Sequence, residues 1–238
     1  MKQDKSRSAL LAVLSFFAVL IGLMACGVAA ESERDGAGMT RQEATASIED
    51  EFKRVGERYD RMIELLTEAQ LQISDGEWKP GMLGMVPRPG RNKWAVRGMG
   101  LENSYYMELF KSTFPPGGVG EKKDLDPMLE YFAAKGWPTE VYEWSTGWAA
   151  RADTGEGFML SWQIQQNGKY NIDIISKTFW GSSKSLLREV VARIPPAQSD
   201  FDDAPPGVAP KFPDWNDPDI YDPVEQVARQ QAELSKQH

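Results

Sequence analysis

The sequence predicts an α+β fold: an antiparallel β-meander packed by a long N-terminal helix and two shorter helices, with an extended acidic C-terminal tail. Three observations predict it. Apolar residues recur at steps of four and three from Ile48 to Ile73, which is the spacing of one helix face. Apolar and polar residues alternate within residues 139–177, as in half-buried strands. Residues 200–225 are rich in acids and prolines, which favours an extended tail.

The chain begins with the features of an export signal. Three basic residues within the first seven precede an almost wholly apolar run from Ala9 to Ala25. The run ends in Leu-Met-Ala-Cys, which contains the only cysteine, Cys26. This ending resembles the bacterial lipobox, with Met24 as the departure from its usual pattern. The resemblance implies cleavage between Ala25 and Cys26, and a diacylglycerol on the Cys26 thiol as the only attached group.

Two alternatives to a lipid anchor remain open. An ordinary signal peptidase site at residues 28–30 would release the protein, and residues 9–30 are long enough to stay as an uncleaved membrane span. The lone thiol favours lipidation, because an exported protein with one unpaired cysteine is unusual. Stable anchoring needs more than one acyl chain. Lipidation predicts a location on the extracytoplasmic face of the cell membrane, with the lipid bilayer as a partner.

The whole architecture is similar to that of the small lipid-anchored α+β proteins of unassigned function in actinobacterial envelopes. The similarity is specific over residues 1–26 and rests on element order over residues 41–194. It carries over no functional residues. Four segments are expected. They are a signal peptide (residues 1–25), a lipidated cysteine with a flexible linker (26–40), the α+β domain (41–194), and a Pro/Asp-rich tail with a short terminal helix (195–238).

Composition excludes several classes of function. Without residues 1–25 the chain keeps 24 basic and 34 acidic residues, and this net negative charge disfavours nucleic acid as a partner. No second cysteine exists to form a disulfide. The only histidine is His238, which excludes Ser-His-Asp and Cys-His catalysis and zinc sites built from His or Cys. The sequence therefore predicts a protein that is not an enzyme and holds no metal, with a carboxylate-only hydrolase as a less favoured alternative.

Three helices are expected in the domain. The capping box Thr40–Glu43 begins the first, which we expect to continue without interruption to the Ser-Asp-Gly sequence at residues 74–76. Its apolar stripe is expected to pack on the protein's own sheet, although the spacing also fits a coiled-coil seam with another chain. Asp126 and Ser183 are the predicted caps of the other two helices.

Strands are expected at residues 94–97, at residues 104–113 (where a helix is the alternative), and in the meander at 139–177. Three-residue loops would fix the register of the meander, because such a loop places Gly at its last position. They predict three sets of facing residues: Ile164 with Tyr170, Trp162 with Ile172 and Leu160 with Ile174; Trp144 with Trp148; and Trp148 with Trp162.

This register would place five aromatic side chains on one face: Tyr142, Trp144, Trp148, Trp162 and Tyr170. Stacked rings of this kind bind sugars, so they are the candidate ligand-binding residues. The competing interpretation, which we favour, is that helices cover this face and the rings are core. The acidic sequence at residues 214–219 and the methionines at 82, 85, 99 and 107 are interpreted as solvated surface and core filling rather than as metal sites.

The sequence thus favours a membrane-anchored, non-catalytic envelope lipoprotein that serves as an interaction or accessory domain. A protein partner would bind the acidic tail, with its four spaced aromatic residues, or the long helix. The alternative is a carrier of a glycan or lipid on the aromatic face of the sheet.

Overall fold

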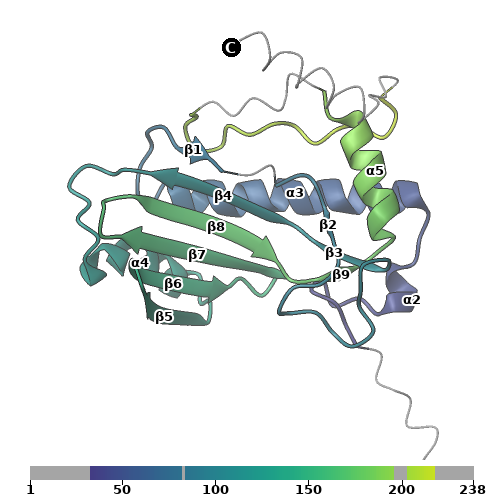
Figure 1. Ribbon diagram of the computed structural model, residues 1–238, viewed down its shortest axis with the longest axis horizontal. Helices are drawn as coiled ribbons and strands as arrows, with labels where there is room; N and C mark the ends of the chain where they lie inside the picture. The colour runs from purple at the N-terminus through teal and green to yellow at the C-terminus, as the bar shows by residue number, and fades with distance from the viewer. Residues whose placement is uncertain (1–32, 82–83, 196–202, 218–238) are drawn as a thin grey trace, which may run out of the picture. The chain divides into compact units, whose positions relative to one another are not determined.

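The computed structural model describes residues 33–81, 84–195 and 203–217, and it confirms the α+β fold (Figure 1). One sheet has six strands in the order β1-β4-β8-β7-β6-β5, and all its pairs are antiparallel. Its strands are β1 Lys79–Pro80, β4 Glu108–Thr113, β5 Thr139–Trp144, β6 Gly147–Asp153, β7 Phe158–Gln165 and β8 Tyr170–Ser176. The predicted meander is its β5-β6-β7-β8 part. A small second sheet contains β2 Arg88–Pro89, β3 Ser104–Tyr106 and β9 Phe179–Trp180.

The predicted first helix is in fact two helices. The capping box at Thr40 is present, but α2 (Arg41–Ala44) ends after four residues. The Thr45 hydroxyl donates a hydrogen bond to the Arg41 carbonyl. A new helix, α3 (Ile48–Gln70), then begins, and the Ser47 side chain caps it by accepting from the Asp50 N–H. Hydroxyl side chains that bond to nearby backbone groups favour caps over helix interiors, which accounts for the break.

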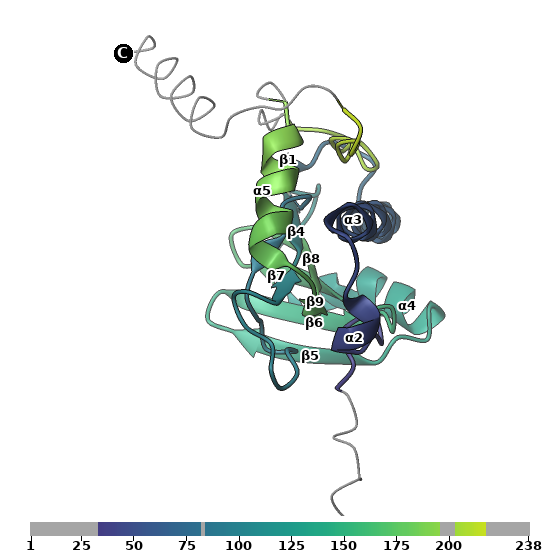
Figure 2. The ribbon, with the colours of Figure 1, turned by 90° about the vertical axis from the view of Figure 1, so that its right-hand side faces the viewer.

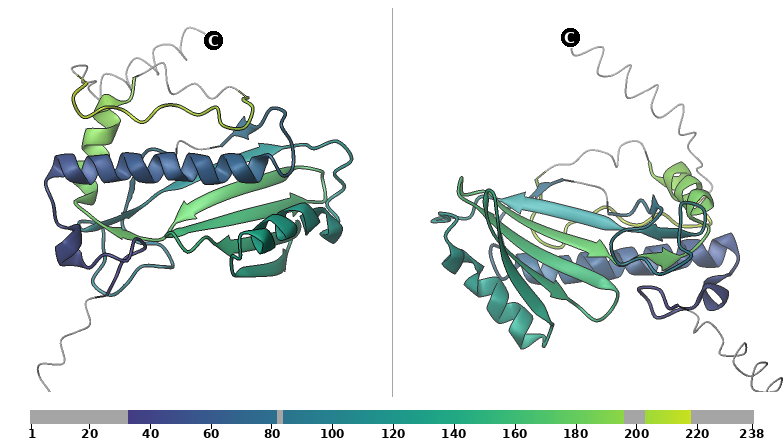
Figure 3. Two further views of the ribbon diagram at one scale, coloured as in Figure 1. Left: turned by 180° about the vertical axis from the view of Figure 1, so that it is seen from behind. Right: turned by 60° about the horizontal axis from the view of Figure 1, so that its bottom comes forward.

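Helix α3 lies across one face of the large sheet, and α4 (Asp126–Ala134) lies on the same face (Figure 3). The apolar stripe of α3 is buried within the chain, with exposures of 3% or less from Phe52 to Ala69. It therefore packs on the protein's own sheet as expected, and the alternative of a coiled-coil seam is wrong. We call the sheet face under α3 and α4 the inner face, and the opposite one the outer face.

Other boundaries differ from expectation. A 3₁₀ turn, η1 (Lys122–Leu125), precedes α4, so Leu125 rather than Asp126 is the cap residue. Helix α5 (Ser183–Arg193) is preceded by Ser182 as cap residue. Residues 94–97 belong to two turns and the loop between them instead of a strand.

The expected strand at residues 104–113 is divided at Met107 between the two sheets. There the Met107 N–H donates to the Ser176 hydroxyl, and the Ser176 N–H donates to the Met107 carbonyl. These two bonds with the end of β8 satisfy the backbone where the chain passes from one sheet to the other.

The N-terminal linker is shorter than expected. Within the predicted flexible segment 26–40, the carboxylate of Asp35 accepts the N–H groups of Ala37, Met39 and Trp180, and Asp35 is 7% exposed. Residues 34–40 are therefore packed on the domain. Ala25 and Cys26, where cleavage and lipidation are expected, lie outside the described residues. Within the described ranges, no helix combines the length and apolar character needed to cross a membrane.

The described part of the tail, residues 203–217, packs back on the domain beside α3 (Figure 1). The Phe212 ring lies 5.1 Å from the ring of Phe52, above Gly56, where an added Cβ would come within 2.9 Å of it. The Trp215 ring lies under the guanidinium of Arg193 at 4.4 Å. Two of the four aromatic residues expected to serve a partner thus pack within the chain. The other two, Phe201 and Tyr221, and the expected terminal helix lie outside the described residues.

Candidate functional site

The register of the meander decides which face each candidate residue occupies. The predicted pairing of β7 with β8 is confirmed, with Ile164 opposite Tyr170 and Trp162 opposite Ile172. The other two predicted pairings are wrong. Trp144 pairs with Gly147 across a two-residue turn, so Trp148 faces Glu143. Trp148 pairs with Ile164, because Asp153 pairs with Met159 across the next loop rather than with Gly157.

The first of these two differences splits the predicted aromatic face. A change of one residue in register moves every side chain of a strand to the opposite face. Tyr142 and Trp144 therefore lie on the outer face, whereas Trp148, Trp162 and Tyr170 lie on the inner face. The structure brings the last three together with the helices and separates them from the first two.

The inner aromatic residues serve mainly as core. Trp162 is fully buried, Tyr170 is 3% exposed, and their rings are 5.4 Å apart in an edge contact. The Trp162 indole N–H donates to the carbonyl of Asp124 at 3.2 Å, and the Tyr170 hydroxyl donates to the Asp124 carboxylate. Both rings border an open hollow of about 190 Å³ beside residues 115–118. Trp148 is half-buried under the ammonium group of Lys122 at 4.6 Å.

Asp124 organises the loop beside these rings. Burial acts to raise the pKa of its carboxyl, but hydrogen bonds from Tyr170 and from the N–H groups of Glu121 and Val119 outweigh it and lower that pKa. The negative charge thus fixes loop and ring together, which is a structural role.

The outer face combines aromatic rings with polar side chains. The Arg151 guanidinium donates to the Tyr142 hydroxyl at 2.9 Å and to the Ser161 hydroxyl at 3.2 Å, and it lies 5.2 Å from the centre of the Tyr142 ring. On the neighbouring strand β8, the Asp173 carboxylate accepts from the Gln163 amide at 2.7 Å. Tyr142, Arg151, Gln163 and Asp173 are each partly exposed. Neither α3 nor α4 covers this face, which is turned to the viewer in Figure 1.

Asp173 is the titratable centre of the outer face. Burial raises the pKa of its carboxyl to about 6, against the opposing effects of the Ser161 and Gln163 hydrogen bonds and of the Arg151 charge. Near neutral pH the group lies close to its own titration range, so a ligand that donates hydrogen bonds would favour the charged form.

Two polar atoms on the outer face are buried without a hydrogen-bond partner in the described part of the chain. They are the indole Nε1 of Trp144 and the amide Oδ1 of Asn171. Buried polar atoms are almost always paired, and an unpaired one costs about 1–3 kcal/mol. One donor and one acceptor on the same face thus retain hydrogen-bonding capacity.

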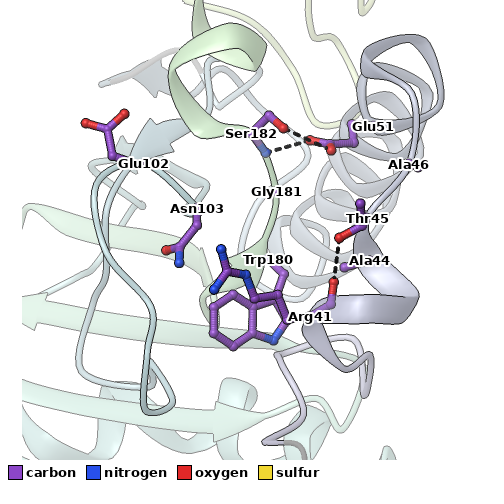
Figure 4. Close-up of a pocket in the computed structure, with 10 residues that line it drawn as sticks. All are labelled: Arg41, Ala44, Thr45, Ala46, Glu51, Glu102, Asn103, Trp180, Gly181 and Ser182. Atoms are coloured by element: carbon purple, nitrogen blue, oxygen red, sulfur yellow. Dashed lines mark hydrogen bonds between the residues drawn. The ribbon is translucent and has the colours of Figure 1, made fainter.

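A separate cavity of about 210 Å³ lies between α2, β9 and the connection from β2 to β3 (Figure 4). The Arg41 guanidinium lies over the Trp180 ring, 5.9 Å from its centre, and faces Asn103 across the cavity. The Glu51 carboxylate accepts the backbone N–H of Ser182 at 2.6 Å and its hydroxyl at 3.1 Å, so both its oxygens serve the structure.

Comparisons with protein-family models, curated proteins and solved structures return no match. Within residues 33–81, 84–195 and 203–217, no cluster of three or more His, Cys, Asp or Glu side chains has the arrangement of a metal site. Met85, Met99 and Met107 are buried, as expected, and Met82 lies outside the described residues.

Sequence reasoning missed the polar half of the outer face. Arg151, Gln163 and Asp173 occupy the polar positions of alternating strands, where side chains are normally assigned to solvent. Their convergence depends on the paired registers Arg151 with Ser161 and Ser161 with Asp173. The two-residue turn before Gly147 was the available signal, because it places Tyr142 and Arg151 on the same face.

Proposed function

We propose that this protein is a lipid-anchored, non-catalytic envelope protein whose domain holds a glycan against the outer face of its sheet. The observation that supports the glycan site is the grouping of Tyr142 and Trp144 with Arg151, Gln163 and Asp173 on a face that neither α3 nor α4 covers. The lipid anchor at Cys26 rests on the sequence resemblance alone.

The chemistry of this face suits a sugar. The apolar faces of pyranose rings pack on aromatic side chains, while planar guanidinium, amide and carboxylate groups exchange directional hydrogen bonds with hydroxyl groups. Asp173 and Arg151 offer charge-assisted bonds, which are the stronger kind. The β6 residues paired with Tyr142 and Trp144 are Ala149 and Gly147, so on this face the two rings stand beside small residues.

The matched pair Trp144 and Trp148 tests the site. Both tryptophans are half-buried, both belong to the hairpin of β5 and β6, and they lie on opposite faces. We expect Trp144→Ala and Arg151→Ala to weaken binding of soluble cell-wall glycan fragments and of chitotetraose about tenfold or more, measured by isothermal titration calorimetry, because each removes a direct ligand contact. Trp148→Ala should leave the affinity within about twofold.

Equal losses in both tryptophan variants would contradict the proposal, as would the absence of any binding by the parent protein. Circular dichroism of each variant separates a lost contact from a lost fold. Intact mass measurement of the protein isolated from membranes tests the anchor separately, because an unmodified Cys26 would remove the anchor without affecting the glycan site.

A protein partner on the tail remains a second candidate, favoured by the acidic composition of residues 200–225. Within residues 203–217, however, Phe212 and Trp215 are already packed on α3 and α5. A partner there would have to displace them. This makes the open outer face the better-supported site.

A further inference from the structure

The connection between β2 and β3, residues 90–103, differs in charge from the rest of the chain. It contains Arg91, Lys93 and Arg97 and one acidic residue, Glu102, in a protein of net charge −8. All three basic side chains are exposed. The ammonium group of Lys93 lies 4.4 Å from the centre of the half-buried Trp94 ring, and Leu101 is 65% exposed. We call residues 90–101 the basic loop.

The basic loop is held in a defined conformation. The side chain of Asn92 bonds to the Ser176 carbonyl and the Thr178 hydroxyl, which ties the loop to the end of β8. The Asn103 amide bridges the backbone of Gly98 and Gly100 within the loop. These hydrogen bonds already order the backbone of the loop. Its backbone therefore loses little conformational entropy when the exposed basic and apolar side chains bind a surface.

The loop lies beside the N-terminal residues of the domain. Met99 packs in one cluster with Ala44 and Trp180, and Met39, Ala95 and Val96 pack against it. Figures 1 and 2 show the connection between β2 and β3 and helix α2 at the same end of the domain. The cavity with Arg41 over Trp180 is at this end too. Four basic residues therefore gather where the described chain begins.

The length of chain before Arg34 sets how far this end can lie from an anchor at Cys26. Arg34 lies eight positions after Cys26, and a fully extended chain spans at most about 29 Å over that length. If Cys26 carries the lipid, as proposed above, the basic loop belongs to the part of the domain nearest the bilayer.

We propose that the basic loop and Arg41 rest on an anionic phospholipid surface and set the orientation of the anchored domain. Basic side chains are attracted to such a surface, and tryptophan and leucine insert at its headgroup level. The acidic remainder of the domain is repelled by the same surface. Two of the nearby acids are paired with basic side chains, Glu102 with Lys184 and Glu43 with Arg34. This inference rests on the proposed lipid anchor.

The single cysteine makes a direct test feasible. When Cys26 is lipidated, a cysteine introduced at Leu101 is the only free thiol and accepts a nitroxide spin label. Phe114→Cys is the matched control, because Phe114 is also an exposed apolar residue, at 57%, in the loop that follows β4. The lipidated proteins are reconstituted into phosphatidylcholine vesicles with and without phosphatidylglycerol, and the label's accessibility to oxygen and to an aqueous nickel chelate is compared.

We expect the label at position 101 to become shielded from the nickel chelate only in vesicles with phosphatidylglycerol, while the label at position 114 stays in water. Neutralising Arg91 and Lys93 to glutamine should weaken this surface contact about fivefold for each charge removed, and high salt should weaken it as well. Equal exposure of both labels in both vesicle types would overturn the proposal while leaving the anchor intact.

If Cys26 proves to be unmodified, the protein has no lipid anchor, but lipid binding by the basic loop can still be tested. The protein as isolated is then sedimented with the same two vesicle types, with and without the Arg91→Gln and Lys93→Gln changes. Binding to phosphatidylglycerol vesicles that the two changes reduce would support a lipid-binding loop without an anchor. Binding that is absent, or insensitive to the changes, would contradict it.

Discussion

The two faces of the large sheet are built from the same strands but differ in what they contact. On the inner face, Trp162, Ile172 and Ile174 are fully buried under helices. On the outer face, Arg151, Gln163 and Asp173 occupy the alternate positions of the same strands and stay partly exposed. Because successive side chains point to opposite faces, one alternating sequence specifies a core and a polar surface at the same time.

The comparison shows that an aromatic residue acquires its role from register rather than from type. Trp144 and Trp148 are four residues apart in one hairpin, yet the turn between them has an even number of residues and places them on opposite faces. Trp148 packs beside the core, whereas Trp144 lies among polar groups with its indole nitrogen unpaired within the described residues.

The difference between the two faces is tested most directly by truncating one tryptophan on each face. We expect Trp162→Ala to lower the free energy of unfolding by about 3–5 kcal/mol. The ring is fully buried, and its removal loses apolar contacts and leaves a cavity in the core. The variant also removes the donor to the Asp124 carbonyl. Urea unfolding followed by circular dichroism measures the change.

Trp144→Ala is the control for this prediction. Its side chain is half-exposed, and its indole N–H is unpaired within the described residues, so the loss should stay below about 1 kcal/mol. Losses of similar size in the two variants would mean that the outer face is as much core as the inner one.

Much of the fold follows from residue patterns, and the reason is local. The spacing of apolar residues in α3 and the alternation in β7 and β8 are determined by burial on one side of each element. The loop ending in Gly168 also determines its own register, because Gly168 adopts a positive φ of 79° there. These features needed no knowledge of distant parts of the chain.

The candidate site was less predictable because it depends on pairings between strands. The expected three-residue loop before Trp148 would have kept Tyr142 and Trp144 on the inner face. The division of residues 104–113 at Met107 depends on Ser176, 69 positions away. The packing of Phe212 against Gly56 is equally long-range, and nothing near either residue in sequence indicates it.

The pH dependence of the free energy of unfolding tests the outer face separately, through the buried carboxyl of Asp173. Burial raises the pKa of this carboxyl in the folded protein to about 6, above the value of 3.8 for a free aspartate. A raised pKa means that the folded state binds the proton more tightly. The stability it contributes is therefore complete below pH 3.8 and is lost as the pH rises through about 6.

Asp173→Asn should therefore be more stable than the parent protein at pH 7, by on the order of 2 kcal/mol, and the difference should vanish toward pH 4. The difference between the two proteins is the readout, because carboxyls with lowered pKa values, such as those of Glu68 and Asp153, add an opposite slope to both. A difference that stays constant with pH would show that Asp173 titrates normally.

The smallest expected effect concerns the support behind the inner face. Helix α3 packs on the sheet with its apolar stripe, and Phe212 and Trp215 of the tail pack against it through Phe52. We expect Phe212→Ala to lower the free energy of unfolding by about 1–2 kcal/mol, less than a fully buried ring, because Phe212 is half-buried. Chemical denaturation measures this change, and amide hydrogen exchange should show faster opening of Tyr59, whose hydroxyl donates to the Pro210 carbonyl at 2.7 Å. Unchanged stability and unchanged exchange would mean that residues 203–217 add nothing to the core, and the tail would then be free to serve a partner.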